Sequence, residues 1–260
     1  MDSEIHSHED NETWYKSDGS VDRFKARHVI KGFLQKYGID YTEIFAPVVR
    51  MEIFRLPLAL AAVMDWEVEQ MDVKTAFPNG YLYAEIYMEQ PVGYAQRGKE
   101  DHVCGFRKSL YGLKQAPRVW YYTFYGVMIG EKFIRLVKGH RVFIKPRGSE
   151  FCIISVYVED LLVIGTKSFV AEIKEILKRR FEMTDLGRVS YLLGWHIDRR
   201  RSERIIFVHQ EKYAAKVLDR FGLGQCRSVR SPEEPSQKLS ESDCLTTDAE
   251  KQEMEKFPYR

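Results

Sequence analysis

Apolar and polar positions along the chain follow two different periods. Alternation with a period of two predicts a strand near residues 66–73. Short strand-like runs predict further strands near 142–145, 151–158, 161–166, 191–197 and 205–209. The turn-forming residues 17–20 divide 14–33 into two more strands. Apolar residues at helical spacing predict helices over 51–65, 121–133, 169–181 and 210–221. This mixture favours an α+β fold with an antiparallel sheet.

Some positions make sharper predictions. Glu67 and Glu69 alternate with Trp66 and Val68, which predicts a strand with one face toward water. Pro57 lies within the first predicted helix and is expected to kink it or shift its start. In the last helix, ending at Gly222, four apolar residues are expected to face inward: Tyr213, Val217, Leu218 and Phe221.

Charge divides the chain into three parts. The 260 residues carry a formal net charge of only +2, but residues 1–12 contain acids and no Lys or Arg, and residues 231–260 are acidic and rich in Ser and Pro. We therefore expect a disordered leader at 1–12, a domain at 13–230 with most of the bases, and a disordered or truncated tail at 231–260. A basic domain suits nucleic acid as a partner, although ordinary solvated surfaces are also charged.

Several protein classes are disfavoured. No apolar run is long enough to span a membrane, and the acidic start lacks the features of a secretory signal, so we expect an intracellular protein, cytoplasmic or nuclear. The four Cys form no C-x-x-C pair, which argues against a zinc site and a disulfide framework. We find no Ser-His-Asp arrangement and no phosphate-binding P-loop.

Two adjacent carboxylates, Glu159 and Asp160, interrupt an otherwise apolar run. Buried acids need partners, so we expect a tight hairpin with this pair at its turn. Asp72, at the end of the strand near 66–73, could join them to bind divalent cations, which prefer carboxylate oxygens. The alternative is a plain surface turn, and the spacing alone does not establish that the three acids converge.

The segment Lys108–Tyr121 combines a glycine, aromatics, cations and a proline at a helix entrance. Gly112 in this setting suits a close approach of the backbone to a nucleotide. The alternative is a loop that leads into an aromatic-rich core helix, with Trp120 packed inside.

These segments, taken in order, resemble the reverse transcriptase domain of Ty1/copia-type retrotransposon polyproteins. The matching stretches are Arg23–Gly32, Ala46–Arg50, Gln70–Phe77, Ile86–Pro91, Lys108–Tyr121, Tyr157–Leu162, Phe181–Gly187, Tyr191–Gly194 and Gln210–Tyr213. The resemblance implies an α+β, right-hand polymerase-like fold, with fingers, a palm built on an antiparallel sheet, and a partial thumb. It implies an RNA-directed DNA polymerase that uses Mg²⁺ or Mn²⁺, an RNA or DNA template with a DNA primer, and deoxynucleoside triphosphates.

The resemblance also implies roles for individual residues. Asp72, Glu159 and Asp160 would be catalytic and would hold the metal. Nucleotide-binding positions would be Lys25, Arg27, Phe77, Gly112, Lys114 and Gln115. Contacts to the primer would come from Leu193, Gly194 and Trp195.

The turn departs from the family pattern Tyr-Val-Asp-Asp, because its first acid is Glu159. The added methylene extends the carboxylate by about 1 Å, and a misplacement of that size can cost roughly 10²-fold in a reaction that depends on alignment. Two functions therefore remain open: a reverse transcriptase with impaired activity, or a decayed or repurposed fragment that at most binds nucleic acid.

Overall fold

The computed structural model describes residues 14–15, 21–23, 29–47, 51–91, 93–227, 240 and 244–254. The predicted leader at 1–12 lies outside these residues, as do Lys25 and Arg27. The chain divides into two compact units. The first comprises Met1–Val189 with Arg201–Arg204, and the second comprises Ser190–Arg200 with Ile205–Arg260.

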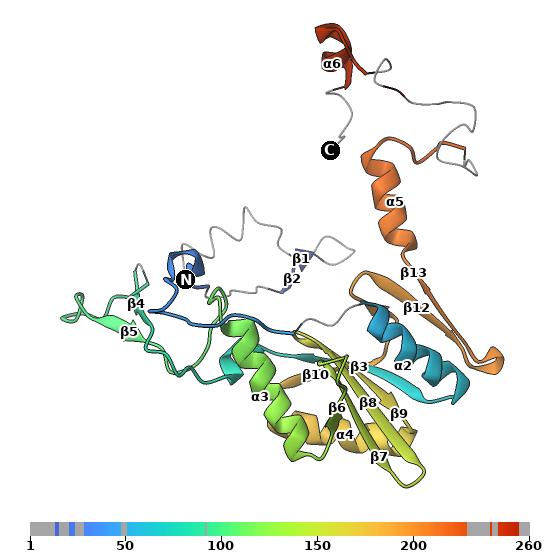
Figure 1. Ribbon diagram of the computed structural model, residues 1–260, viewed down its shortest axis with the longest axis horizontal. Coiled ribbons are helices and arrows are strands. Elements are labelled where there is room, and N and C mark those ends of the chain that lie inside the picture. The colour runs from blue at the N-terminus through green and yellow to red at the C-terminus, as the bar shows by residue number, and fades with distance from the viewer. Residues whose placement is uncertain are drawn as a thin grey trace. The chain divides into compact units, whose positions relative to one another are not determined.

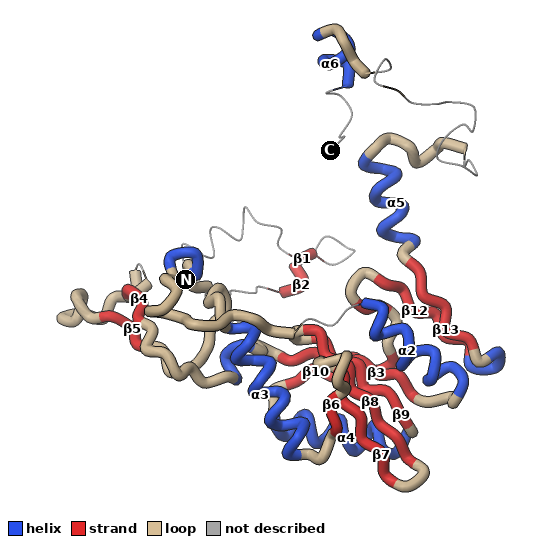
Figure 2. The backbone as a smooth tube through the Cα atoms, in the orientation of Figure 1, coloured by secondary structure: helices blue, strands red, loops and turns tan. Residues whose placement is uncertain are grey.

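A six-stranded antiparallel sheet forms the centre of the first unit (Figures 1 and 2). In spatial order its strands are β10 (Met183–Arg188), β3 (Glu67–Val73), β9 (Asp160–Gly165), β8 (Glu150–Tyr157), β7 (Val142–Arg147) and β6 (Ile134–Arg135). The strands predicted at 66–73, 142–145, 151–158 and 161–166 are thus confirmed, as is the antiparallel sheet. β10 was not predicted.

Three helices pack on this sheet: α2 (Met51–Val63), α3 (Ala116–Gly130) and α4 (Lys167–Arg180). One buried core joins side chains of α3 and α4, such as Trp120 and Phe169, to Met71 of β3 and Leu161 of β9. α2 contacts β3 and β9 through a separate set of buried residues that includes Phe54. α2 starts at Met51 and includes Pro57, so the start of the helix is not shifted, while the alternative of a kink at Pro57 stays a prediction.

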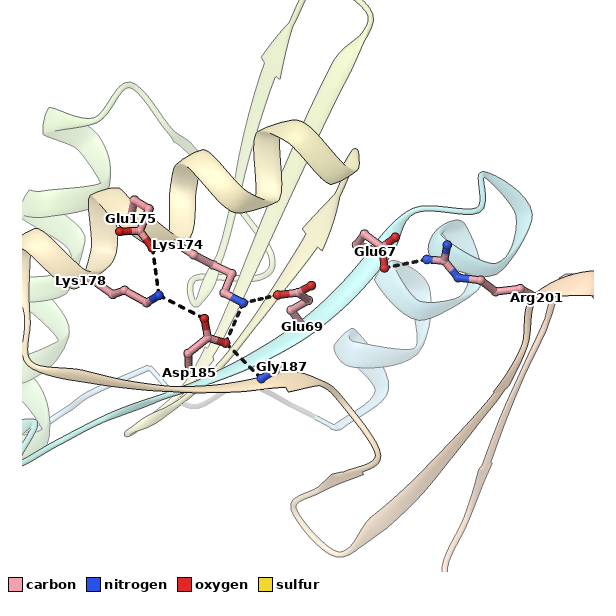
Figure 3. A network of polar contacts seen from close by, with 8 residues as sticks. All are labelled: Glu67, Glu69, Lys174, Glu175, Lys178, Asp185, Gly187 and Arg201. Carbon is pink, nitrogen blue, oxygen red and sulfur yellow. Dashed lines mark hydrogen bonds and ion pairs between the residues drawn. The ribbon is translucent and has the colours of Figure 1, made fainter.

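The prediction of a water-facing side on β3 is wrong. Glu67 is buried and Glu69 is partly buried. Each carboxylate meets a cation from a distant part of the chain, with Arg201 Nη2 2.7 Å from Glu67 and Lys174 of α4 bonded to Glu69 (Figure 3). Ion pairing offsets the cost of removing a charge from water, so both acids can lie on a face of β3 that is covered by other segments. The alternating pattern alone predicts that this face is exposed to water.

Smaller elements complete the first unit. The hairpin expected within 14–33 is present as β1 (Trp14–Tyr15) paired with β2 (Val21–Arg23). The others are the 3₁₀ turns η1 (Gly32–Leu34), η2 (Phe77–Asn79) and η3 (Arg201–Glu203), and the antiparallel pair β4 (Tyr87–Glu89) and β5 (Val103–Gly105).

The second unit contains a three-stranded sheet, β11 (Tyr191–Leu192), β12 (Trp195–Arg200) and β13 (Ile205–His209), followed by α5 (Glu211–Arg220) and the short α6 (Asp248–Met254). The strand predicted at 191–197 is broken by a turn. The inward apolar face predicted for the last helix is also wrong, because Tyr213 is 63% exposed and its three apolar neighbours are exposed too. Across the described residues, we find no helix with the length and apolar character needed to cross a membrane.

Candidate active site

Asp72 and Asp160 lie opposite each other on neighbouring strands. They are Cα partners in the antiparallel register of β3 and β9, which places both side chains on the same face of the sheet. The neighbouring positions Met71 and Leu161 point the other way, into the core shared with α3 and α4. The sheet therefore joins two carboxylates that are 88 residues apart in the sequence.

The turn between β8 and β9 comprises Val158 and Glu159, because Tyr157 pairs with Asp160. Val158 has a φ of 53°, which is costly for a β-branched residue. Two hydrogen bonds hold the turn in this conformation. The indole Nε1 of Trp120 donates to the carbonyl oxygen of Val158 at 2.7 Å, and the backbone N–H of Val73 donates to that of Glu159 at 2.9 Å. The expected hairpin is confirmed and is fixed from two sides, but its turn lies one residue earlier than expected, because Asp160 already belongs to β9.

The side chain of Glu159 is bound by a tyrosine. The hydroxyl of Tyr111 donates a hydrogen bond to Glu159 Oε1. The ring of Tyr111 is buried and packs against Phe77, with 4.7 Å between the ring centroids. Tyr111 thus connects both Phe77 and the segment around Gly112 to the turn that contains Glu159.

Asp160 carries an unfavourable charge. Burial raises the pKa of Asp160 above its usual value, the nearby Glu159 adds to this effect, and a hydrogen bond donated by Gln70 Nε2 at 3.1 Å opposes it. Gln70 lies two residues before Asp72 on β3 and so shares its face. A carboxylate of this kind is stabilised in its charged form when a cation binds beside it.

The acids at the hairpin meet the needs of a divalent cation with two carboxylates. Within the described residues, no group of three His, Cys, Asp or Glu side chains is arranged to hold a metal ion. Mg²⁺ commonly takes only one or two protein carboxylates and completes its shell with phosphate oxygens and water. Asp72 and Asp160 match that requirement in number and chemistry, while Glu159 is engaged by Tyr111.

The predicted nucleotide-binding motif makes contacts within the chain. Gly112 has a φ of 92°, and a Cβ there would lie 2.0 Å from the carbonyl oxygen of Ile30, so its close approach is to backbone. The backbone N–H of Lys114 donates to Gln35 Oε1 at 2.8 Å, and Gln115 Nε2 donates to the carbonyl of Asp40 at 3.0 Å. These residues fasten segment 30–41 to the entrance of α3.

The three predicted primer contacts belong to the second unit. Leu193 and Gly194 form the turn between β11 and β12, with Trp195 starting β12, all in the second unit. Gln70, Tyr111 and Trp120 contact the acidic hairpin but were not assigned to the site from the sequence. The only signal for them was their membership of the motifs Gln70–Phe77 and Lys108–Tyr121.

Asp72 and Asp160 lie at adjoining ends of two antiparallel strands, and Asp160 directly follows a tight hairpin turn. Together they define a candidate divalent-cation site on a fold of mixed sheet and helices. Comparison with known proteins identifies the family. The sequence model described as "Reverse transcriptase (RNA-dependent DNA polymerase)" matches residues 8–235, and the chain belongs to this family. No solved structure is significantly similar to the chain.

Similar curated proteins are retrotransposon polyproteins. The chain is 47% identical over 249 residues to the "Retrovirus-related Pol polyprotein from transposon TNT 1-94" of Nicotiana tabacum, covering 94% of this chain and 19% of that protein. It is 36% identical to the corresponding polyprotein from transposon RE1 of Arabidopsis thaliana, covering 87% of this chain and 15% of that protein. The chain therefore corresponds to the reverse transcriptase domain of a retrotransposon Pol polyprotein and spans less than a fifth of these relatives.

Proposed function

We propose that this domain catalyses RNA-directed DNA synthesis by nucleotidyl transfer, adding deoxynucleoside triphosphates to a DNA primer on an RNA or DNA template. The observation that carries the proposal is the pairing of Asp72 with Asp160 across β3 and β9, directly beside the turn that contains Glu159. Phosphoryl transfer depends mainly on positioning and on neutralising phosphate charge, and acids from separate strands suit that task.

Asp72 and Asp160 would hold the divalent ion, Mg²⁺ or Mn²⁺, with Glu159 as a third ligand once released by Tyr111. When bound, such an ion neutralises the triphosphate and activates the attacking hydroxyl. Gln70 holds Oδ1 of Asp160 and leaves the other carboxylate oxygen for the metal. The ring of Phe77, packed on Tyr111, would lie against the sugar of the incoming nucleotide and disfavour a 2′-hydroxyl.

The polymerase parts would be distributed as follows. The six-stranded sheet with α3 and α4 would be the palm. Segment 29–47, with Lys25 and Arg27 before it, would belong to the fingers and approach the triphosphate, and Gly112, Lys114 and Gln115 would anchor it. The β11–β12 turn with Leu193, Gly194 and Trp195 would hold the primer end, and α5 would begin a partial thumb.

A primer-extension assay tests this function. The purified chain is incubated with an RNA template, a labelled DNA primer, deoxynucleoside triphosphates and either Mg²⁺ or Mn²⁺. We expect incorporation that falls to background in Asp72→Asn and Asp160→Asn but persists in Asp101→Asn, which removes an exposed acid from the turn before β5.

The same assay distinguishes an active polymerase domain from a non-catalytic fragment. If the folded chain extends no primer with either metal, and Glu159→Asp does not change this, polymerase activity is rejected. Activity that survives Asp72→Asn would instead place catalysis at other residues or in a contaminating enzyme.

A further inference from the structure

The carboxylate of Glu159 belongs to the acidic turn but is bonded to a tyrosine. The hydroxyl of Tyr111 donates a hydrogen bond to Glu159 Oε1. Within the described residues, no three acids are placed to hold one metal ion together, so Glu159 does not join the two carboxylates that face each other across β3 and β9. The chain thus places a third acid next to the candidate cation site without directing it at the cation.

Both partners of this hydrogen bond are fixed by their surroundings. On one side, the backbone N–H of Val73 donates to the carbonyl oxygen of Glu159 at 2.9 Å. On the other, the backbone N–H of Ile30 donates to the carbonyl oxygen of Tyr111 at 2.8 Å. The ring of Tyr111 is buried and packs on Phe77, with 4.7 Å between the ring centroids. Tyr111 therefore cannot follow the carboxylate, and Glu159 gives up the hydroxyl whenever its side chain moves away.

The hydrogen bond and a divalent cation compete for the carboxylate of Glu159. A hydrogen bond from a hydroxyl to an ionised carboxylate is stronger than one between neutral groups. Mg²⁺ needs only one or two protein carboxylates, so a cation can bind to Asp72 and Asp160 while Glu159 stays with Tyr111. When a third ligand requires a conformation that is only partly populated, the affinity falls by the fraction that is populated.

We propose that Tyr111 is a positioning residue that withholds Glu159 from the cation, so that the metal is taken up by two carboxylates and gains the third only after this hydrogen bond breaks. The inference rests on the proposed polymerase function, since it concerns the regulation of the same metal site. It makes a prediction of its own, because removing the hydroxyl of Tyr111 should tighten metal binding. A tyrosine that only supported the fold would have no such effect.

Binding of Mn²⁺ to the purified chain, without nucleotide or nucleic acid, tests this inference. EPR spectroscopy measures the free Mn²⁺, and Asp160→Asn identifies the binding that belongs to this site. We expect Tyr111→Phe, which keeps the buried ring, to lower the Kd of this site for Mn²⁺ about tenfold. Tyr94→Phe, which removes a hydroxyl from an exposed tyrosine between β4 and β5, should leave that Kd unchanged. Matching melting curves check that Tyr111→Phe retains the fold.

A double-mutant cycle assigns the effect to Glu159. Glu159→Gln removes a charge near the site whether or not Tyr111 is present, so the general electrostatic effect cancels in the cycle. We expect Glu159→Gln to weaken Mn²⁺ binding about tenfold more in the Tyr111→Phe chain than in the unaltered chain.

The outcomes distinguish this inference from the polymerase function. If Tyr111→Phe does not lower the Kd, or if Glu159→Gln has the same effect in both chains, the withholding of Glu159 is overturned while primer extension can still succeed. If no Mn²⁺ binding depends on Asp160, the inference and the metal site of the proposed function both fail.

Discussion

Replacing Lys174 with methionine should strongly destabilise the first unit. Lys174 is 8% exposed, and its Nζ forms ion pairs with Glu69 on β3 and with Asp185 on β10, the latter at 2.6 Å (Figure 3). This one ammonium group, from α4, thus joins the helix to two neighbouring strands. Methionine keeps most of the length of the side chain but leaves both carboxylates without this cation.

The size of the effect follows from burial. Removing one partner of a buried ion pair costs about 3–5 kcal/mol. The carboxylates of Glu69 and Asp185 retain 23% and 31% exposure, so we expect the lower end, about 3 kcal/mol. For a domain of this size that loss lowers Tm by roughly 6–12 °C. Circular dichroism melts measure it directly, with urea unfolding as a second readout.

Lys178→Met provides the matched control. Lys178 lies one helical turn further along α4 and contacts the same Asp185 at 3.2 Å, but its side chain is 34% exposed. Exposed ion pairs contribute about 0–1 kcal/mol. If Lys174→Met lowers Tm by no more than Lys178→Met does, the reasoning is refuted, because burial of the lysine would then make no difference.

Acid should diminish the effect. Burial opposes the charge of Asp185, but hydrogen bonds from Lys174, from the backbone N–H of Gly187 and from Lys178 outweigh it and hold the pKa of Asp185 below its usual value. A pKa that is lower in the folded chain adds stability above the ordinary pKa near 4, and this stability is lost as the pH falls through the lowered value. The gap between wild type and Lys174→Met should therefore narrow in that acidic range, and a gap that stays constant would contradict this assignment.

Three further changes test other parts of the structure. Glu159→Asp should increase primer extension by up to about 10²-fold, because it shortens the side chain and breaks the bond from Tyr111; an unchanged rate would show that Glu159 does not limit catalysis. Gly112→Ala should lower stability by roughly 1–3 kcal/mol in urea unfolding, because φ is 92° and the Cβ would meet the carbonyl of Ile30; a wild-type midpoint would contradict this close approach. Pro57→Ala should raise Tm, because a proline inside a helix costs about 3 kcal/mol and the loss of its ring contacts offsets only part of that gain. A lower Tm would mean that packing of the proline ring contributes more than the helix gains.

The central hairpin could be predicted because its information is local. Residues 151–158 and 161–166 are apolar and rich in β-branched side chains, and the two acids between them indicate a turn. The observed turn starts one residue earlier than this pattern predicts, at Val158. The helix over 169–181 was predicted for the same reason, since its apolar spacing matches one buried face.

Contacts between distant segments could not be predicted from these patterns. The acids of β3 were assigned to water because their cations, Lys174 and Arg201, lie more than 100 residues later in the chain. The bond from Tyr111 to Glu159 spans 48 residues, and nothing in either segment alone indicates it. The register that sets Asp72 against Asp160 likewise required the assembled sheet.

The link between Trp120 and Val158 has a consequence for the order in which the chain is made. The left-handed Val158 is strained, and the indole that holds its carbonyl comes from α3, which the ribosome releases before β8 and β9. When the acidic hairpin emerges, its partner is thus already present, and the carboxylates can take their positions as soon as the strands pair. A circular permutant that moves α3 behind the hairpin should fold to the same structure but acquire the acidic turn as its last step.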